Sequence, residues 1–284
     1  MKKVWKKSLA IVTTAILTAT ALVGCGGKSE SNVDENGFTV VKVGVVGEYN
    51  DQWDTVNELL EQDKIKVELV KFSDYAAPNR ALADGEIDLN AFQHKAFLEN
   101  DIQQKGYKIE AIGDTLIAPL AIYNNKEKIS SVEDIKDGDI IAIPSDLTNG
   151  GRALKLLEAA GIIECDPAKG YVPTKADITK YNKKIEIKEA ESATLAKILP
   201  DCAAALINGG NAFTAGLDPQ TDAIYTEDVN PETNEAVSDL INVIVARSEE
   251  KDNEVYQKIV AAYQTDEVKK TIEESYHGAF ICTW

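Results

Sequence analysis

The feature that most constrains the fold is an alternation of short apolar strands with amphipathic helices, which starts at residue 38 and starts again at residue 140. Phe38–Val46 is rich in β-branched residues and predicts a strand, and Ile140–Pro144 predicts the first strand of a second series. The passage between the two series, Lys126–Asp139, is charged and rich in turn residues. Strands that alternate with helices indicate an α/β fold with parallel-rich sheets covered by helices on both faces.

We therefore predict two α/β lobes joined by two crossings, with hinge closure around a ligand as the expected motion. Lobe 1 is predicted to comprise residues 38–126 and 237–284, and lobe 2 residues 127–236. The first crossing is expected at Lys126–Asp139, and the return within Asp218–Asp239. Further expectations are helices at Asp74–Ala83 and Ala153–Ala160, a long loop at Ile162–Tyr181, a strand at Leu240–Ala246, and Thr265 as an N-cap.

The first residues predict export and a lipid anchor. Four lysines precede Ser8–Val23, an apolar stretch too short for a confident transmembrane helix. The stretch ends in LVGC, which resembles the lipobox of bacterial lipoproteins and implies cleavage after residue 24 and a thioether-linked lipid, with palmitate, on Cys25. The alternative is an ordinary secretory signal with an incidental cysteine. Residues 25–37 then form a polar tether that holds the domain on the extracytoplasmic face of the cell membrane.

The charge and the cysteines exclude several classes of protein. Removing the four lysines of residues 1–24 takes the formal charge from −17 to −21. So acidic a chain argues against binding to nucleic acid or adsorption to anionic lipid, and leaves the acyl chains as the anchor. The mature chain keeps Cys165, Cys202 and Cys282, an odd number that no disulfide framework covers, although a bridge between Cys165 and Cys202 stays open.

One stretch, Asp88–Leu98, predicts part of a ligand site. Its sequence DLNAFQHKAFL indicates the end of a buried strand at Ile87–Asn90, followed by a helix from Gln93 onward. Ligands of open α/β sheets bind beyond the carboxyl ends of the strands, so Phe92, His94 and Phe97 would face a ligand there. The alternative is that the two rings are core residues and that His94 is a satisfied polar group.

Four other residues are candidates for the same site. Arg152 follows Asn149-Gly150-Gly151 where a helix is expected to start, and a helix N-terminus together with a guanidinium fork suits a carboxylate. Asn208 and Asn242 each lie beside a predicted strand and offer both a donor and an acceptor. Tyr75, near the start of an expected helix, would present its ring. The alternatives are a surface arginine, turn or cap asparagines, and an ordinary packed tyrosine.

Four segments resemble the methionine-binding lipoprotein family of bacterial ABC importers: FSDYAAPNRALADGEIDLNAFQHKAFL, IPSDLTNGGRALKLLEAAGI, ALINGGNAFTAGL and INVIVAR. The likeness runs from about Val41 to the C-terminus. It implies a type II periplasmic-binding-protein fold and a partner permease with a cytoplasmic ATPase. It also implies that Tyr75, Phe92, His94 and Phe97 surround the ligand side chain, that Arg152 binds its carboxylate, and that Asn208 and Asn242 bind its polar main-chain atoms.

The chain also departs from the family pattern. Ala96 stands where proline is usual, Phe97 where tyrosine is common, and Gly210-Asn211 where Asn-Tyr is usual. L-methionine is the expected ligand. D-methionine, a methionyl dipeptide or another apolar amino acid would use the same groups.

Other functions are less well supported. The sequence carries no catalytic motif order, no CxxC and no HExxH, so we expect no catalytic residue, no metal and no cofactor. The competing hypotheses are a secreted hydrolase that uses His94 as a general base, and a surface interaction protein that has lost its ligand. An intact Arg152 argues against the second. The expected state is a monomer.

Overall fold

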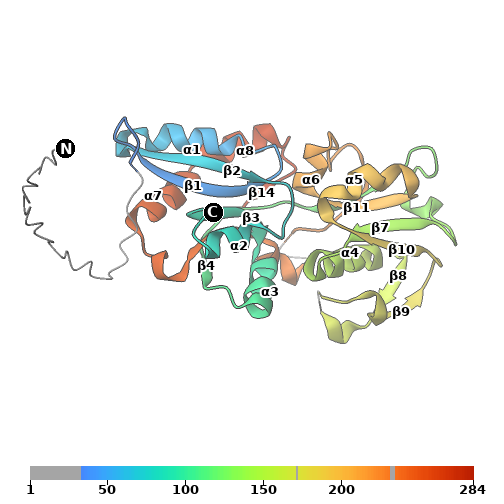
Figure 1. Cartoon of the computed structure of the whole chain (residues 1–284). Helices are drawn as coiled ribbons and strands as arrows, with labels where there is room; N and C mark the ends of the chain where they lie inside the picture. Colours follow the sequence, from blue (N-terminus) through green and yellow to red (C-terminus); the bar gives the residue numbers. More distant parts are fainter. Residues whose placement is uncertain (1–32, 171, 231–233) are drawn as a thin grey trace, which may run out of the picture. The chain divides into compact units, whose positions relative to one another are not determined.

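The computed structural model describes residues 33–170, 172–230 and 234–284, and these form two five-stranded mixed sheets, each flanked by helices (Figure 1). The predicted fold, two lobes that are each a mixed sheet between helices, is confirmed. The Cys25 anchor lies outside the described residues. Within the described ranges, no helix is long and apolar enough to cross a membrane.

The first sheet has the strand order β2-β1-β3-β13-β4. Strand β1 pairs in parallel with β2 and β3, whereas β13 runs antiparallel to β3 and β4. A strand from near the C-terminus thus lies between two strands from the first half of the chain. The strands are β1 (Thr39–Val46), β2 (Ile65–Phe72), β3 (Leu89–His94), β4 (Ile109–Asp114) and β13 (Asn242–Arg247).

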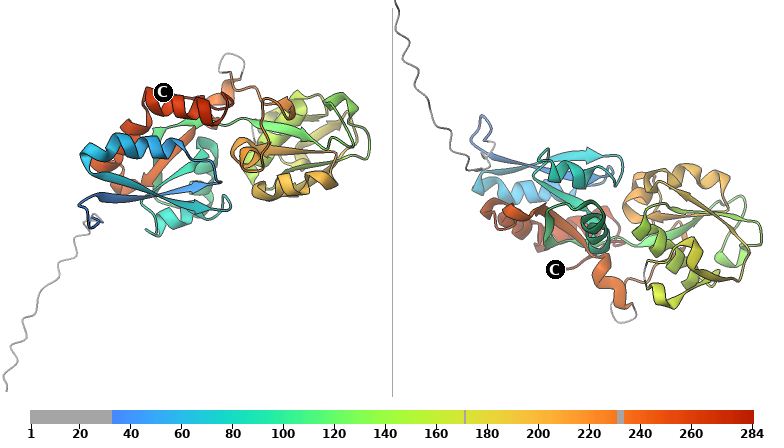
Figure 2. Two further views of the ribbon diagram at one scale, coloured as in Figure 1. Left: turned by 90° about the horizontal axis from the view of Figure 1, so that it is seen from above. Right: turned by 60° about the horizontal axis from the view of Figure 1, so that its bottom comes forward.

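Helices cover both faces of the first sheet (Figure 2). On one face, Trp53 of α1 and Ile259 of α7 are fully buried against β1, in a cluster that includes Val43. On the other face, Leu82 of α2 and Leu98 of α3 pack against β13. The helices are α1 (Gln52–Leu60), α2 (Pro78–Ala83), α3 (Lys95–Lys105), α7 (Glu254–Tyr263) and α8 (Asp266–Ser275).

The second sheet has the order β10-β7-β11-β6-β12. Strands β10, β7 and β11 are parallel, and β6 runs antiparallel to β11 and β12. Helix α4 packs on one face of this sheet, and α5 and α6 pack on the other. The elements are β6 (Leu120–Asn124), β7 (Ile140–Pro144), α4 (Leu147–Ala159), β10 (Glu186–Ala190), α5 (Leu195–Ile198), β11 (Ala204–Asn208), α6 (Gly209–Thr214) and β12 (Ala223–Thr226).

The remaining elements of the described residues are short β-ribbons and 3-10 turns. Two ribbons pair β5 (Leu116–Ile117) with β14 (Ile281–Cys282), and β8 (Ile163–Cys165) with β9 (Ile178–Tyr181). The 3-10 turns are η1 (Glu61–Asp63), η2 (Val132–Asp134), η3 (Pro167–Lys169), η4 (Lys175–Asp177), η5 (Ser192–Thr194), η6 (Leu199–Asp201), η7 (Glu235–Leu240) and η8 (Ser248–Glu250).

Sheet membership corrects one predicted boundary. Strand β6 belongs to the second sheet, so the chain leaves the first sheet before Leu120, and Lys126–Asp139 lies wholly within the second-sheet part. The apolar run of β6 predicts a buried strand equally well for either sheet, which is why its sequence does not reveal the crossing. The region Ile162–Tyr181, expected to be a loop, contains the β8–β9 ribbon.

The three cysteines of the described residues, Cys165, Cys202 and Cys282, are free thiols. Cys165 packs on the α4 face of the second sheet and Cys202 on the α5 face, so the sheet separates them. The bridge left open from the sequence is therefore not made.

Candidate functional site

The junction between β3 and α3 positions the rings of Phe92, His94 and Phe97. His94 ends β3 and caps α3, because its Nδ1 accepts a hydrogen bond from the Phe97 N–H at 3.1 Å. This cap holds the Phe97 ring edge-to-face against Phe92, with ring centroids 5.9 Å apart. The Tyr75 ring lies 5.9 Å from Phe92 and 6.1 Å from Phe97, so the three rings form one wall. Tyr75 precedes α2, which begins at Pro78 rather than at Asp74 as predicted.

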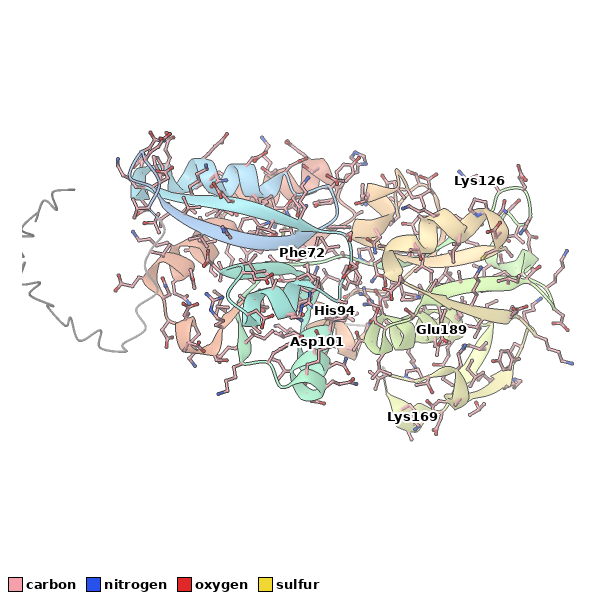
Figure 3. All side chains as sticks on the ribbon, in the orientation of Figure 1. Phe72, His94, Asp101, Lys126, Lys169 and Glu189 are labelled. Atoms are coloured by element: carbon pink, nitrogen blue, oxygen red, sulfur yellow. The ribbon has the colours of Figure 1, made fainter. Side chains whose placement is uncertain are left out.

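His94 is neutral in this setting. Burial, and secondarily the positive charge of Arg152, lower its pKa to about 3. Because Nδ1 accepts from the Phe97 N–H, the ring proton is on Nε2, which lies 3.3 Å from the Asn149 Oδ1. Figure 3 labels His94 at the end of the first sheet that faces the second. The imidazole is therefore a fixed hydrogen-bonding group and not a base at neutral pH.

Asn149 connects the two sides of the site. Its Oδ1 accepts from the Asn208 Nδ2 at 2.7 Å as well as from His94. Its Nδ2 donates to Asp146 Oδ1 at 3.0 Å, and Asp146 caps α4 by accepting from the Asn149 N–H. In the sequence, Asn149 is predicted only as part of the Asn-Gly-Gly lead into the helix. Its side chain, 2 % exposed, is a functional candidate that was missed.

Helix α4 begins five residues before Arg152, which corrects the prediction of a helix starting at Ala153. Both glycines are helical residues, the fourth and fifth of α4, and a Cβ on Gly150 would approach the Pro144 carbonyl oxygen to 2.9 Å. Glycine is needed there for close packing of the helix on β7 rather than for contact with a ligand. Arg152 therefore lies inside the helix and not at its N-terminus. The prediction that the helix N-terminus beside Arg152 helps to bind a carboxylate was wrong.

Arg152 is buried and paired with Glu227. Its Nε donates to Glu227 Oε1 at 2.7 Å, and its Nη2 donates to Glu227 Oε2 and, at 2.9 Å, to the Ala118 carbonyl. The exposed fractions of the two side chains are 4 % and 8 %. The guanidinium fork expected to hold a ligand thus holds an internal carboxylate. Glu227 follows β12 in a loop-rich acidic passage, where nothing in the sequence distinguished it.

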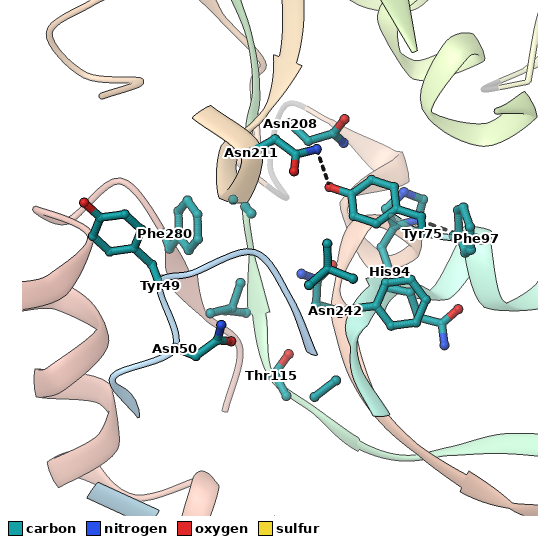
Figure 4. A pocket seen from close by; sticks show the side chains of 18 of the residues that line it. Tyr49, Asn50, Tyr75, His94, Phe97, Thr115, Asn208, Asn211, Asn242 and Phe280 are labelled. Carbon is teal, nitrogen blue, oxygen red and sulfur yellow. Dashed lines mark hydrogen bonds between the residues drawn. The ribbon is translucent and has the colours of Figure 1, made fainter. Parts of the chain in front are cut away.

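Two asparagines on α6 and β11 add polar atoms. Asn211 Nδ2 donates to the Tyr75 hydroxyl at 3.1 Å, which links the second sheet to the aromatic wall (Figure 4). Asn208 Oδ1 is buried and has no hydrogen-bond partner among the described residues. A buried acceptor without a hydrogen bond is energetically costly, so this oxygen is a strong candidate to accept a hydrogen bond from a ligand.

All seven predicted ligand residues line one pocket that is partly open to solvent: Tyr75, Phe92, His94, Phe97, Arg152, Asn208 and Asn242. Its lining of aromatic side chains with a few polar groups is typical of small-molecule clefts. Asn242, opposite His94 in the β3–β13 pairing, reaches it from the first sheet. Further lining residues that were missed include Tyr49, Asn50, Thr115, Asn149, Asn211 and Phe280. No cluster of potential metal ligands occurs among the residues that the structure describes.

Comparisons with known proteins agree on one family. A family model described as NlpA lipoprotein matches residues 41–284. The D-methionine-binding lipoprotein MetQ of Escherichia coli (strain K12) is 38% identical over 274 residues, which are 95% of this chain and 96% of that protein.

Two solved structures are similar over most of the chain. A nutrient binding protein from Burkholderia cenocepacia bound to methionine has a TM-score of 0.80 and 35% identity, covering 86% of this chain and all of that one. The substrate binding protein of a methionine transporter from Streptococcus pneumoniae has a TM-score of 0.81 and 36% identity, covering 87% and 96% of the two chains. With its fold, its pocket and the matched family model in agreement, this chain belongs to the NlpA lipoprotein family.

Proposed function

We propose that this chain is an extracytoplasmic binding protein that captures methionine in the pocket between its two sheets and delivers it to an ABC importer. The observation that carries the proposal is the unpaired, buried Asn208 Oδ1 in a pocket that also offers an aromatic wall and one arginine. A zwitterion with an apolar, polarisable tail satisfies all three. The names of the relatives, which include methionine-binding and methionine-transporter proteins, support this ligand class.

Each part of the ligand has a proposed partner. The thioether tail packs on Tyr75, Phe92 and Phe97, since sulfur–aromatic contacts contribute about 0.3–1.5 kcal/mol each. The ammonium donates to Asn208 Oδ1, and the side chain of Asn242 completes the polar end. The carboxylate accepts from Arg152 Nη1, because Nε and Nη2 are engaged elsewhere.

The stereochemistry is a finer proposal. We propose L-methionine as the physiological ligand, while the Escherichia coli relative is named for D-methionine. D-methionine, a methionyl dipeptide and other apolar amino acids are the alternatives to be measured beside it.

The proposed mechanism is closure of two lobes around the ligand. Because β6 pairs within the second sheet, lobe 1 is proposed to comprise residues 38–118 and 237–284, and lobe 2 residues 119–236. The aromatic wall lies on the first lobe and Arg152 on the second, so a ligand held by both favours the closed state.

The proposed setting is the outer face of the cell membrane, with the lipid on Cys25 as the anchor and a permease with a cytoplasmic ATPase as the partner. The Cys25→Ser variant is expected to leave the membrane fraction for the periplasm or the medium, as measured by fractionation. A variant that stays fully membrane-bound would contradict the anchor.

The experiment that tests the function is a thermal-shift and calorimetric screen of the full chain over L- and D-amino acids and methionyl dipeptides. Ligand at about a hundred times its dissociation constant stabilises the folded state by about 2.7 kcal/mol. We expect L-methionine to give the largest shift. No shift with any methionine derivative would overturn the proposal, and hydrolysis of a dipeptide would favour the enzyme hypothesis instead.

A further inference from the structure

The buried pair of Arg152 and Glu227 has a consequence for which ligands the pocket accepts. The two side chains meet through two parallel hydrogen bonds, from Nε to Oε1 and from Nη2 to Oε2. A bidentate pair of this kind is the strongest arrangement an arginine and a carboxylate can make. The positive charge of Arg152 is therefore offset by a carboxylate of the protein itself.

Glu227 is held firmly in this place. Its Oε2 also accepts from the Leu120 N–H at 3.1 Å, and its own N–H donates to the Leu120 carbonyl at 2.9 Å. These bonds tie it to the first residue of β6. The carboxylate therefore cannot follow Arg152 toward a ligand or leave it without losing its hydrogen bond from the Leu120 N–H.

The donors that remain on Arg152 are few. Of its five N–H groups, Nε uses one, and Nη2 uses both of its own, on Glu227 and the Ala118 carbonyl. Nη1 has no hydrogen bond to any of the described residues. A ligand carboxylate thus receives up to two hydrogen bonds from Nη1, but it meets no uncompensated positive charge.

The other groups that face the pocket do not change this balance. Arg152 is the one charged side chain among the described lining residues, and His94 is neutral because burial lowers its pKa. Asp146, beside Asn149, adds a second carboxylate whose field reaches Tyr75 on the aromatic wall. Counting Glu227, the formal charges of the described pocket lining and its paired carboxylate sum to zero, and Asp146 adds one negative charge nearby.

We propose that Glu227 is a selectivity residue, which neutralises Arg152 so that the pocket accepts net-neutral zwitterions and rejects carboxylate anions of the same shape. This inference rests on the proposed amino-acid-binding function. A zwitterion brings its own ammonium to Asn208 Oδ1. A simple anion must give up its hydration with no net charge to replace it, which is costly in a buried site.

The test measures three ligands of one shape on the full chain by calorimetry: methionine, 4-(methylthio)butanoate, which lacks the ammonium, and 3-(methylthio)propylamine, which lacks the carboxylate. We expect the wild-type protein to bind methionine best and the butanoate no more tightly than the amine. In Glu227→Gln, the ratio of the butanoate dissociation constant to that of methionine is expected to fall by about tenfold or more, because Arg152 regains an unbalanced charge. Glu227→Asp, which keeps the charge, is expected to preserve the ratio.

The matched control is Glu250→Gln. Glu250 pairs with Arg247 at 2.6 Å in the first-sheet part of the chain, with exposed fractions of 13 % for the arginine and 17 % for the glutamate, and neither residue lines the pocket. A general effect of losing a partly buried arginine–glutamate pair would appear in both variants, whereas the ratio changes only in Glu227→Gln.

The outcomes separate the two proposals. If the wild-type protein does not bind methionine, the proposed function fails. If it binds methionine and the ratio in folded Glu227→Gln is unchanged, the selectivity role is overturned and the function stands. If Glu227→Gln does not fold, the affinities of the wild-type protein for the butanoate and the amine decide between the outcomes. The inference is overturned if the wild-type protein binds the butanoate about tenfold or more tightly than the amine, and it is supported if the amine binds more tightly.

Discussion

The two sides of the pocket differ in the kind of side chain that lines them. On the first-sheet side, Tyr75, Phe92 and Phe97 meet edge to face or tilted, and the nearby imidazole of His94 is uncharged. On the second-sheet side, Asn149 and Arg152 belong to a network of amides and carboxylates. One side offers shape and polarisable surface, and the other offers directed hydrogen bonds and charge.

The difference indicates how such a pocket can couple recognition to movement. An apolar tail contacts the aromatic wall of the first side, and the carboxylate and ammonium are proposed to contact Arg152 and Asn208 of the second. Only a ligand with an apolar tail and a polar head contacts both sides. The difference between its affinities for the closed and the open state is the free energy that favours closure. The predictions below break one side at a time.

The largest effect is expected from Arg152→Ala. It removes the donors on the second side and leaves Glu227 as an uncompensated buried carboxylate, so binding weakens by about 2–5 kcal/mol and the melting temperature falls. Calorimetry measures the binding, and small-angle scattering measures the loss of ligand-induced compaction. Arg152→Lys keeps the charge without the fork and is expected to bind weakly. Methionine binding by Arg152→Ala within about threefold of wild type would refute the proposed carboxylate role.

Phe92→Ala tests the opposite side. Removal of this ring is expected to weaken methionine binding by about 2–4 kcal/mol, the range for losing a buried aromatic anchor. Binding of alanine, which has no tail to reach the wall, is expected to change much less. Equal losses for the two amino acids, measured in parallel titrations, would make Phe92 a structural residue.

His94 gives a pH-dependent prediction. Its folded-state pKa of about 3 lies below the ordinary value of 6.5, so the unfolded chain takes up a proton first as the pH falls. Stability from the neutral imidazole is complete above pH 6.5 and is lost progressively as the pH falls toward 3, by up to about 1.4 kcal/mol per pH unit. Denaturant titrations at several pH values are expected to show this slope, and His94→Asn, which can still cap α3, is expected to lack it. The same slope in both proteins would contradict a lowered pKa.

The smallest effect is expected from Tyr75→Phe. This change keeps the ring of the aromatic wall and removes only the hydroxyl that accepts from Asn211 at 3.1 Å. We expect binding to weaken by about 0.5–1.5 kcal/mol, the usual net contribution of one hydrogen bond. A double-mutant cycle with Asn211→Ala measures the coupling of the two sides directly. Additive losses would show that this bond does not contribute to closure.

Local patterns were sufficient to predict most of the elements and all seven ligand candidates. The β-branched run of β1 and the cap at Thr265 are set by neighbouring residues, and both are confirmed. The FQH stretch lines the pocket as expected from its place at the end of a buried strand. The predicted local structure was wrong there, because β3 continues to His94 and α3 begins at Lys95, whereas the strand was expected to end at Asn90 and the helix to begin at Gln93.

What could not be predicted depends on partners distant in the chain. Arg152 was expected to offer its fork to a ligand, but Glu227, 75 residues away, occupies it. Strand β6 was placed in the wrong lobe because its apolar run carries no information on which neighbours it pairs with. The start of α4 was missed because two glycines indicate a turn, while the cap at Asp146 and the close approach of Gly150 to β7 favour a helix.

The position of β13 has a consequence for biosynthesis. This strand lies between β3 and β4, yet residues 242–247 are synthesised only after every strand of the second sheet. Until they arrive, β3 and β4 present unpaired edges, which are prone to pairing with other chains. The second sheet is encoded by one uninterrupted segment, Leu120 to Thr226, and can assemble while the first sheet still waits for its central strand. Synthesis therefore completes the strands of the second sheet before the central strand of the first, and a chain cut short before Asn242 would retain a finished second sheet and an open, association-prone first one.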